Sequence, residues 1–238
     1  MNFPGFLPKR TVSVAVVVLS AAGLSGCFDL EQRVGLHSNG SGTYDVVVSA
    51  DGIVADGLEK KPADIDVGDN RAVRHVVRHG DRTIETSEVA FNELSDLKLD
   101  DETLSLHVKG QKLLGLGGTE VNFHRSFHVD HARRHHDQDD SHLGHDILQS
   151  MFGDHTYTFS VWLPGEIEHI ASLRVGDQVV QPVVQSDKYG HTVTWKMKLT
   201  DMFLADRLDF DVDFAAHGDF HDSQSGEGHH RHHHGDET

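Results

Sequence analysis

Apolar and polar residues alternate with a period of two over much of the chain beyond residue 100. The apolar members of these runs are Leu104, Leu106 and Val108; Val121, Phe123, Phe127 and Val129; Tyr157, Phe159 and Val161; Val193, Trp195, Met197 and Leu199; and Leu208, Phe210, Val212 and Phe214. Alternation of this kind gives a strand one dry face and one wet face, which is typical of antiparallel sheets. The pattern therefore predicts a strand in each run.

The first part of the predicted domain is also expected to be β structure. Asn39-Gly40-Ser41-Gly42 is a turn signal, and the run Tyr44 to Val48 that follows is rich in β-forming residues, so a hairpin is expected. Helical patterns are few: residues 52–61, ended by Pro62, and residues 141–151. The predicted fold class is α+β, mainly antiparallel β-sheet with few helices.

The N-terminus resembles a bacterial lipoprotein leader. Lys9 and Arg10 precede a mostly apolar run, residues 12–23, that is too short to span a membrane. It is followed by Leu24-Ser25-Gly26-Cys27, the apolar, small, small, cysteine order that a lipoprotein signal peptidase recognises. Residues 1–26 are therefore predicted to be a signal peptide, and Cys27 the acylated first residue of the mature chain. The alternative is an ordinary secretory leader that happens to contain a cysteine.

Charge and cysteine content restrict the chemistry further. The formal charge of −17 argues against nucleic acid and against electrostatic docking on anionic lipid. Without Lys9 and Arg10 the mature chain has a charge of −19, and protonation of all 21 histidines would bring it to +2, so a pH-dependent surface is a further hypothesis. Cys27 is the only cysteine, so a metal site must use histidine, carboxylate or carbonyl ligands.

Most of the histidines fall into two segments. One holds His124, His128, His131, His135, His136, His142, His145 and His155, and the other holds His217, His221, His229, His230, His232, His233 and His234. Imidazole is a common ligand of zinc, copper and nickel. The predicted metal ligands are His131, His135, His136, His142 and His145 in the first segment and His229, His230, His232, His233 and His234 in the tail. The alternative is a solvated linker with a histidine bias.

The spacing of the histidines along the chain distinguishes pairs that could share a metal ion from pairs that could not. His124 and His128 lie on a predicted strand, where residues four apart are roughly 13 Å from each other, too far to share one ion. A helix over residues 141–151 would instead place His142 and His145 on one face, within reach of one ion. A solvated polar face on a short amphipathic helix is the alternative.

Four short motifs carry a resemblance to a known family. They are the lipobox Cys27, the hairpin Gly40-Ser41-Gly42-Thr43-Tyr44, the strand end Leu163-Pro164-Gly165, and the strand Thr192-Val193-Thr194-Trp195. With these the chain resembles the LppM-type lipoprotein domain over most of residues 28–214. The resemblance implies a curved antiparallel sheet packed on helices, as in lipid-cradling helix-grip folds, and a role in binding envelope lipid.

The domain organisation predicted from this resemblance has three parts. Residues 1–26 form the leader, residues 27–216 an LppM-like domain with a histidine-rich insertion at 131–155, and residues 217–238 a disordered histidine-rich tail. The insertion and the tail depart from the family, whose members often end in a membrane helix.

The function expected from the sequence is binding, not catalysis. The chain has no G-x-S-x-G, H-E-x-x-H or phosphate-loop motif, so no enzymatic activity is expected. The favoured function is a lipid-anchored, extracytoplasmic protein of the cell envelope that captures zinc or, alternatively, copper or nickel. A lipid-binding envelope protein with accessory histidines is the second hypothesis. The expected partners are the membrane, divalent metal ions and envelope lipid, and no nucleic acid.

Overall fold

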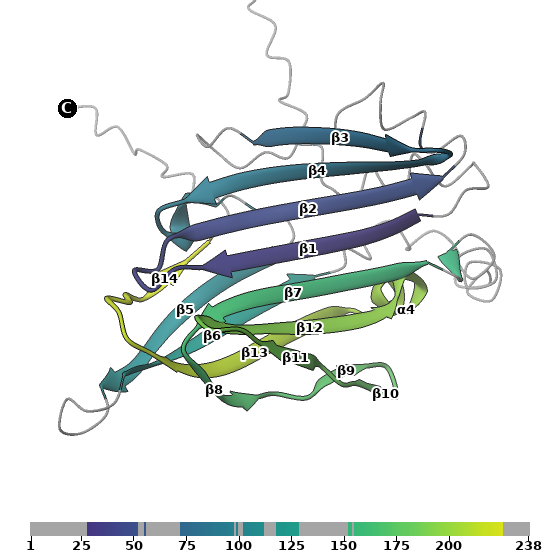
Figure 1. Cartoon of the computed structure of the whole chain (residues 1–238). Coiled ribbons are helices and arrows are strands. Elements are labelled where there is room, and N and C mark those ends of the chain that lie inside the picture. Colours follow the sequence, from purple (N-terminus) through teal and green to yellow (C-terminus); the bar gives the residue numbers. More distant parts are fainter. Residues whose placement is uncertain are drawn as a thin grey trace, which may run out of the picture.

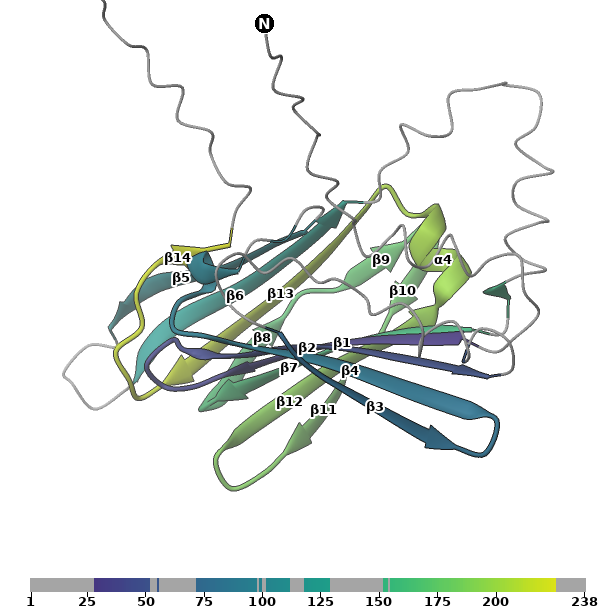
Figure 2. The same cartoon turned by 90° about the horizontal axis from the view of Figure 1, so that it is seen from above.

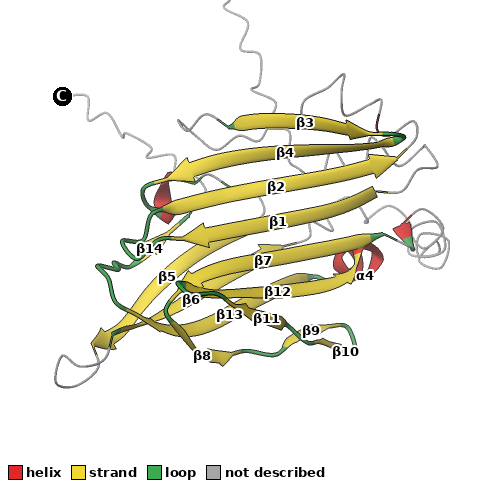
Figure 3. Ribbon diagram, viewed as in Figure 1, coloured by secondary structure: helices red, strands yellow, loops and turns green. Residues whose placement is uncertain are grey.

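The computed structural model describes residues 28–51, 55, 72–97, 99, 102–111, 118–128, 152–153 and 155–225. Its strands are β1 (Phe28–Leu36), β2 (Gly42–Asp51), β3 (Val73–His79), β4 (Arg82–Phe91), β5 (Glu102–Gln111), β6 (Thr119–His128), β7 (Thr156–Pro164), β8 (Glu166–Ile170), β9 (Leu173–Val175), β10 (Gln178–Val180), β11 (Val183–Ser186), β12 (Gly190–Lys198), β13 (Arg207–Ala216) and β14 (Ser223–Gln224). Two short helical elements accompany them, η1 (Leu94–Asp96) and α4 (Leu199–Leu204). Strands dominate the described chain (Figure 3).

The strands form two large sheets and one small one. The seven-stranded sheet has the order β11-β12-β7-β1-β2-β4-β3, and the five-stranded sheet has the order β14-β5-β6-β13-β8. All neighbours are antiparallel except β1 and β7, which run parallel in the middle of the seven-stranded sheet (Figure 1). Strands β9 and β10 pair as a separate hairpin. The predicted mainly antiparallel β fold with few helices is confirmed.

The two large sheets pack face to face, and Figure 2 shows the five-stranded sheet lying over the seven-stranded one. The layer between them is aromatic: Phe159 of β7 lies 6.4 Å from Phe123 of β6 and 4.7 Å from Phe210 of β13, and Trp195 of β12 lies 5.3 Å from Phe210, measured between ring centroids. Burying each such side chain contributes roughly 1.5–3 kcal/mol. The family resemblance implies helices packed on the large sheet. Within the described residues, this face is covered by the five-stranded sheet instead.

The alternation predicted the strand cores correctly, and the structure differs from the predictions in two places. Leu199, predicted as the last strand position of its run, begins α4 and is buried. The predicted tail start at His217 is also too early, because Phe220 is buried against Phe214 at 5.6 Å and Ser223–Gln224 pair with β5. Apolar burial and backbone pairing therefore keep the chain folded up to Ser225.

The register of the strands defines two ends of the molecule. One end is called the α4 end, because α4 lies there (Figure 1). It also holds the first residues of β1, β4, β7 and β13 and the last residues of β2, β3, β6 and β12. The opposite end of the seven-stranded sheet carries the β1–β2 turn, residues 37–41, and the β11–β12 turn, residues 187–189, and is called the turn end.

Candidate functional site

The residues predicted to carry the function lie outside the described residues. These are the lipidation residue Cys27, the insertion residues His131, His135, His136, His142 and His145, and the tail residues His229, His230, His232, His233 and His234. The predicted helices at residues 52–61 and 141–151 also lie outside the described residues. The exception is Ala55, which is helical and buried. What the structure describes is how the neighbouring residues are held.

The two described residues that flank the insertion lie at the same end of the molecule. His128 ends β6 and pairs with Arg207 at the start of β13, while Thr156 begins β7 and pairs with Lys198 at the end of β12. The short α4 joins β12 to β13, so it connects these two pairs. Both described flanks of the histidine-rich segment therefore lie at the α4 end.

The residue that follows Cys27 lies at this end as well. Phe28 is 6% exposed, and its backbone N–H donates to Nδ1 of His155, 2.9 Å away. The His155 ring is itself buried and contacts Phe152 edge-on at 6.2 Å. Because Nδ1 accepts a hydrogen bond here, His155 is engaged in holding the start of β1 and is not a free metal ligand.

Asp29 adds a second connection at the start of β1. Its Oδ1 accepts hydrogen bonds from the backbone N–H and the hydroxyl of Thr156, at 3.0 and 2.9 Å, and its Oδ2 accepts one from Arg82 at 2.9 Å. Partial burial acts to raise the pKa of Asp29, but the hydrogen bonds from Thr156 and Arg82 outweigh it and hold the pKa below its usual value. Strands β1, β4 and β7 are thus connected through one carboxylate.

A row of polar side chains covers the outer face of the five-stranded sheet. Nδ1 of His124 lies 2.8 Å from a carboxylate oxygen of Asp211, and the next carboxylate along β13, Asp213, accepts from Lys109 at 2.7 Å and from Asn122 at 2.8 Å. The hydrogen bond to Asp211 raises the pKa of His124 despite partial burial. His124 and His128 share β6, as predicted, and among the described residues no three histidine, cysteine or acidic side chains lie close enough together to hold a metal ion.

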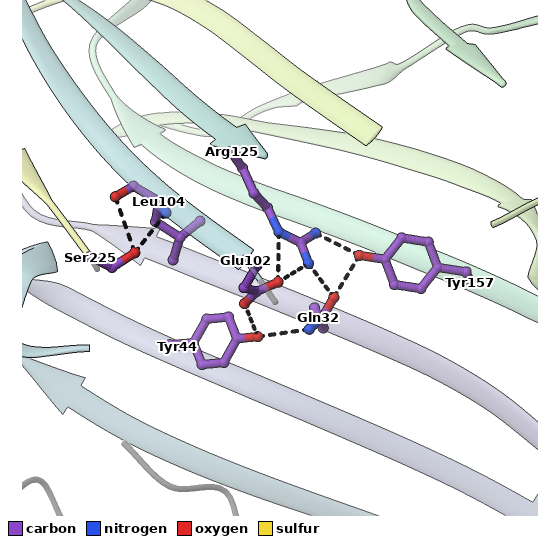
Figure 4. Close-up of polar contacts among 7 residues, drawn as sticks. All are labelled: Gln32, Tyr44, Glu102, Leu104, Arg125, Tyr157 and Ser225. Atoms are coloured by element: carbon purple, nitrogen blue, oxygen red, sulfur yellow. Dashed lines mark hydrogen bonds and ion pairs between the residues drawn. The ribbon is translucent and has the colours of Figure 1, made fainter. Parts of the chain in front are cut away.

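Five polar side chains meet between the two sheets, and they are called the buried polar cluster: Gln32, Tyr44, Glu102, Arg125 and Tyr157 (Figure 4). Arg125 is completely buried and donates to Glu102, to the Gln32 side-chain oxygen at 2.5 Å and to the Tyr157 hydroxyl at 2.5 Å. Glu102 also accepts from the Tyr44 hydroxyl at 2.5 Å. The guanidinium lies 4.2 Å from the ring centroid of Phe159, within cation–π range.

The electrostatics of the cluster follow from burial. Burial opposes the charge on Arg125, but the adjacent Glu102 side chain more than compensates, so the pKa of Arg125 is raised and its guanidinium remains charged. Burial raises the pKa of Tyr157 to about 12 and also raises that of Tyr44, so both phenols stay protonated. Each polar group of Arg125 has a partner, which makes the cluster a connection between the sheets and not a reactive centre.

None of the predictions from sequence includes this cluster, although the sequence contains a signal for it. Arg125 occupies the position between Phe123 and Phe127 on the apolar side of the alternation, where a period of two requires an inward-facing residue. A charged residue at such a position needs a buried partner of opposite charge. Which acidic residue provides it depends on the strand pairing of β5 and β6, and that pairing is not visible in the sequence.

Comparisons with known proteins give a limited result. No family model matches the chain, and no curated protein does. Among solved structures, the chain is similar to the NMR structure of the folded domain of LppM from Mycobacterium tuberculosis, with 10% sequence identity, 81% of this chain and 93% of that chain covered, and a TM-score of 0.39. A likeness at this level carries no argument about function, so the LppM-type resemblance stays a prediction. No helix in the described part of the chain is long and apolar enough to cross a membrane.

Proposed function

We propose that this chain is a lipid-anchored, extracytoplasmic protein of the cell envelope that captures zinc or another divalent transition metal through its histidine-rich insertion and tail. The observation that carries the proposal is the hydrogen bond from the Phe28 N–H to Nδ1 of His155. It joins the residue after the predicted lipidation site to the residue that closes the histidine-rich insertion. The residue after the predicted anchor and both flanks of the insertion therefore lie at the α4 end of one folded domain.

The proposal gives the folded domain the role of a scaffold. Two histidines of its described part already have hydrogen-bond partners: His124 is bonded to Asp211, and His155 accepts from the Phe28 N–H. The proposed ligands are the five insertion histidines and the five tail histidines named above. Segments rich in imidazole bind divalent metals through many exchanging arrangements, which suits capture and release better than a closed tetrahedral site does. The proposal assigns no catalytic residue.

A zinc titration against a competing chelator tests the metal-binding part. The parent protein carries Cys27→Ser so that it is soluble, and two variants lack residues 131–146 or residues 226–238. The second deletion begins after Ser225, because Ser225 is buried and hydrogen-bonded to Leu104. We expect tight zinc binding by the parent and a stepwise loss with each deletion.

Two sets of substitutions in the insertion distinguish zinc binding by imidazole from zinc binding by carboxylate charge. One variant changes His131, His135, His136, His142 and His145 to Gln, and its control changes Asp137, Asp139 and Asp140 to Asn. Only the histidine variant should lose zinc stoichiometry, because imidazole is the expected ligand. Zinc binding by the parent no tighter than that of a free histidine-rich peptide would exclude metal capture.

Lipid binding in the core receives less support. A lipid chain between the sheets would compete with Phe159, Trp195 and Phe210, which are 0–1% exposed and in mutual contact. Organic extraction of the soluble Cys27→Ser protein, followed by mass spectrometry, distinguishes the two functions. A stoichiometric lipid recovered from the soluble Cys27→Ser protein would favour the lipid-binding function.

A further inference from the structure

The fold begins immediately after the proposed anchor. Consecutive Cα atoms are about 3.8 Å apart, so an acyl group on Cys27 is attached one residue before the first residue of the sheet. Phe28 is already buried and is the first residue of β1, which pairs from its first position with Ala50 of β2. No flexible spacer separates the acylated residue from the folded domain.

The start of β1 is held too firmly to act as a spacer itself. The Phe28 N–H donates to His155, and Asp29 is bonded to Thr156 and Arg82. Arg82 in turn donates to the Ser49 hydroxyl at 2.6 Å and lies 3.7 Å from Asp51, so β4 and β2 are connected to the same point. Detaching one or two residues from the sheet would break several of these bonds together.

From this geometry we propose that the α4 end of the domain lies directly against the lipid bilayer, and that the seven-stranded sheet projects away from it with the turn end outermost. This inference rests on the lipid anchor of the proposed function and adds an orientation to it. The occupant of the α4 end is the lipid surface itself. Strand β2 has nine residue steps of about 3.3 Å, which places the turn end about 30 Å further out.

The chemistry of the α4 end suits a lipid headgroup layer. Leu204, the last residue of α4, is 39% exposed, and its neighbour Phe203 packs partly on the core. Exposed charges of both signs occur at this end: Lys198 and Arg207 are positive, and Asp81 and Asp206 are negative.

Fluorescence quenching by lipid tests the orientation. Cys27 is the only cysteine, and acylation blocks its thiol, so Asp81→Cys or Lys188→Cys supplies one free thiol for a dye. These are matched exposed positions in hairpin turns, one at the α4 end and one at the turn end. The full-length lipidated protein is reconstituted in phosphatidylcholine and phosphatidylglycerol vesicles that contain a lipid with a nitroxide on its headgroup.

We expect the dye at position 81 to lose most of its fluorescence and the dye at position 188 to lose almost none. As a control, a Gly/Ser linker of about 15 residues is inserted between Cys27 and Phe28, which allows an average separation of about 20 Å from the anchor. With the linker, the difference between the two positions should disappear while the protein stays bound to vesicles.

The outcomes separate this inference from the proposed function. Protein that fails to float with the vesicles lacks the anchor, which overturns the membrane part of the function and this inference together. Protein that floats but shows equal quenching at both positions, or stronger quenching at position 188, keeps its anchor and overturns the orientation alone.

Discussion

At the scale of single residues, the least replaceable polar contact is the one between Arg125 and Glu102. The pair is buried between the sheets, and three further side chains complete its hydrogen bonds. Breaking a buried pair from one side leaves an uncompensated charge, which typically costs about 3–5 kcal/mol. We expect Arg125→Met to lower the free energy of unfolding by that amount in urea denaturation of the Cys27→Ser protein.

A double variant provides the control for this prediction. In Arg125→Met with Glu102→Met, both charges are absent, while Gln32 still accepts from Tyr157 and donates to Tyr44. Part of the lost stability should return, because no buried charge remains without a partner. A double variant less stable than Arg125→Met alone would contradict the view that the uncompensated carboxylate is the main cost.

His124 gives the surface a small pH dependence of known sign. Its pKa in the folded state is raised by Asp211 above the unfolded value, so the contribution to stability is complete at low pH and disappears as pH rises through the folded-state pKa. We expect His124→Gln to lower the free energy of unfolding by less than about 1 kcal/mol near pH 5.5 and by almost nothing near pH 8.5, since the pair is partly screened.

His128→Gln is the matched control for this measurement. It lies on the same strand and is exposed, and its described contact is with the neutral hydroxyl of Ser126, at 3.4 Å. Urea titrations of both variants at the two pH values should show a pH-dependent loss for His124→Gln alone. Equal behaviour of the two variants would show that Asp211 does not stabilise the charged imidazole.

At the scale of elements, the segment after β13 belongs to the fold. Phe220 is buried, the Asp222 carboxylate accepts from the Val108 N–H at 2.6 Å, and Ser225 bonds to Leu104. A chain ending at Ala216 loses these contacts, and we expect it to be about 2–4 kcal/mol less stable than one ending at Ser225. Thermal and urea unfolding of the two truncated proteins measures the difference. Equal stability would show that the contacts of residues 217–225 do not contribute.

The elements that the sequence predicted are those buried on one side. Strands β5, β6, β7, β12 and β13 carry regular alternation because one face of each meets the other sheet. Strand β3 was not predicted, since Val73-Arg74-His75-Val76-Val77-Arg78-His79 lies at a sheet edge and is mostly exposed. The short edge strands β8 and β11 were missed for the same reason, because exposed edges impose little pattern on sequence.

The parallel pairing of β1 with β7 could not be predicted from periodicity. Alternation reports which face of a strand is buried, but not which strand lies beside it or in which direction that strand runs. For the same reason the sequence indicated that His124 and His128 share a strand, yet it could not place His155 next to Phe28. The candidate residues were identifiable by type, whereas their arrangement depends on long-range register.

At the scale of the whole molecule, the two ends of the described structure differ in how the strands are linked by side-chain hydrogen bonds. The bonds of Phe28, Asp29 and Arg82 all lie at the α4 end, together with both flanks of the histidine-rich insertion. The turn end carries the β1–β2 and β11–β12 turns, and the latter includes Tyr189, which is 72% exposed. The residue after the proposed anchor, both flanks of the insertion and the proposed membrane contact thus lie at one end of the sandwich.

The parallel pairing in the middle of the large sheet also determines when the protein can fold. Leu30 pairs with Tyr157, and the Phe28 to His155 bond spans 127 positions of sequence. A chain that emerges N-terminus first cannot complete its central sheet until β7 has followed, and such distant pairing folds slowly. During synthesis, β1 therefore keeps one open edge until β7 has been made.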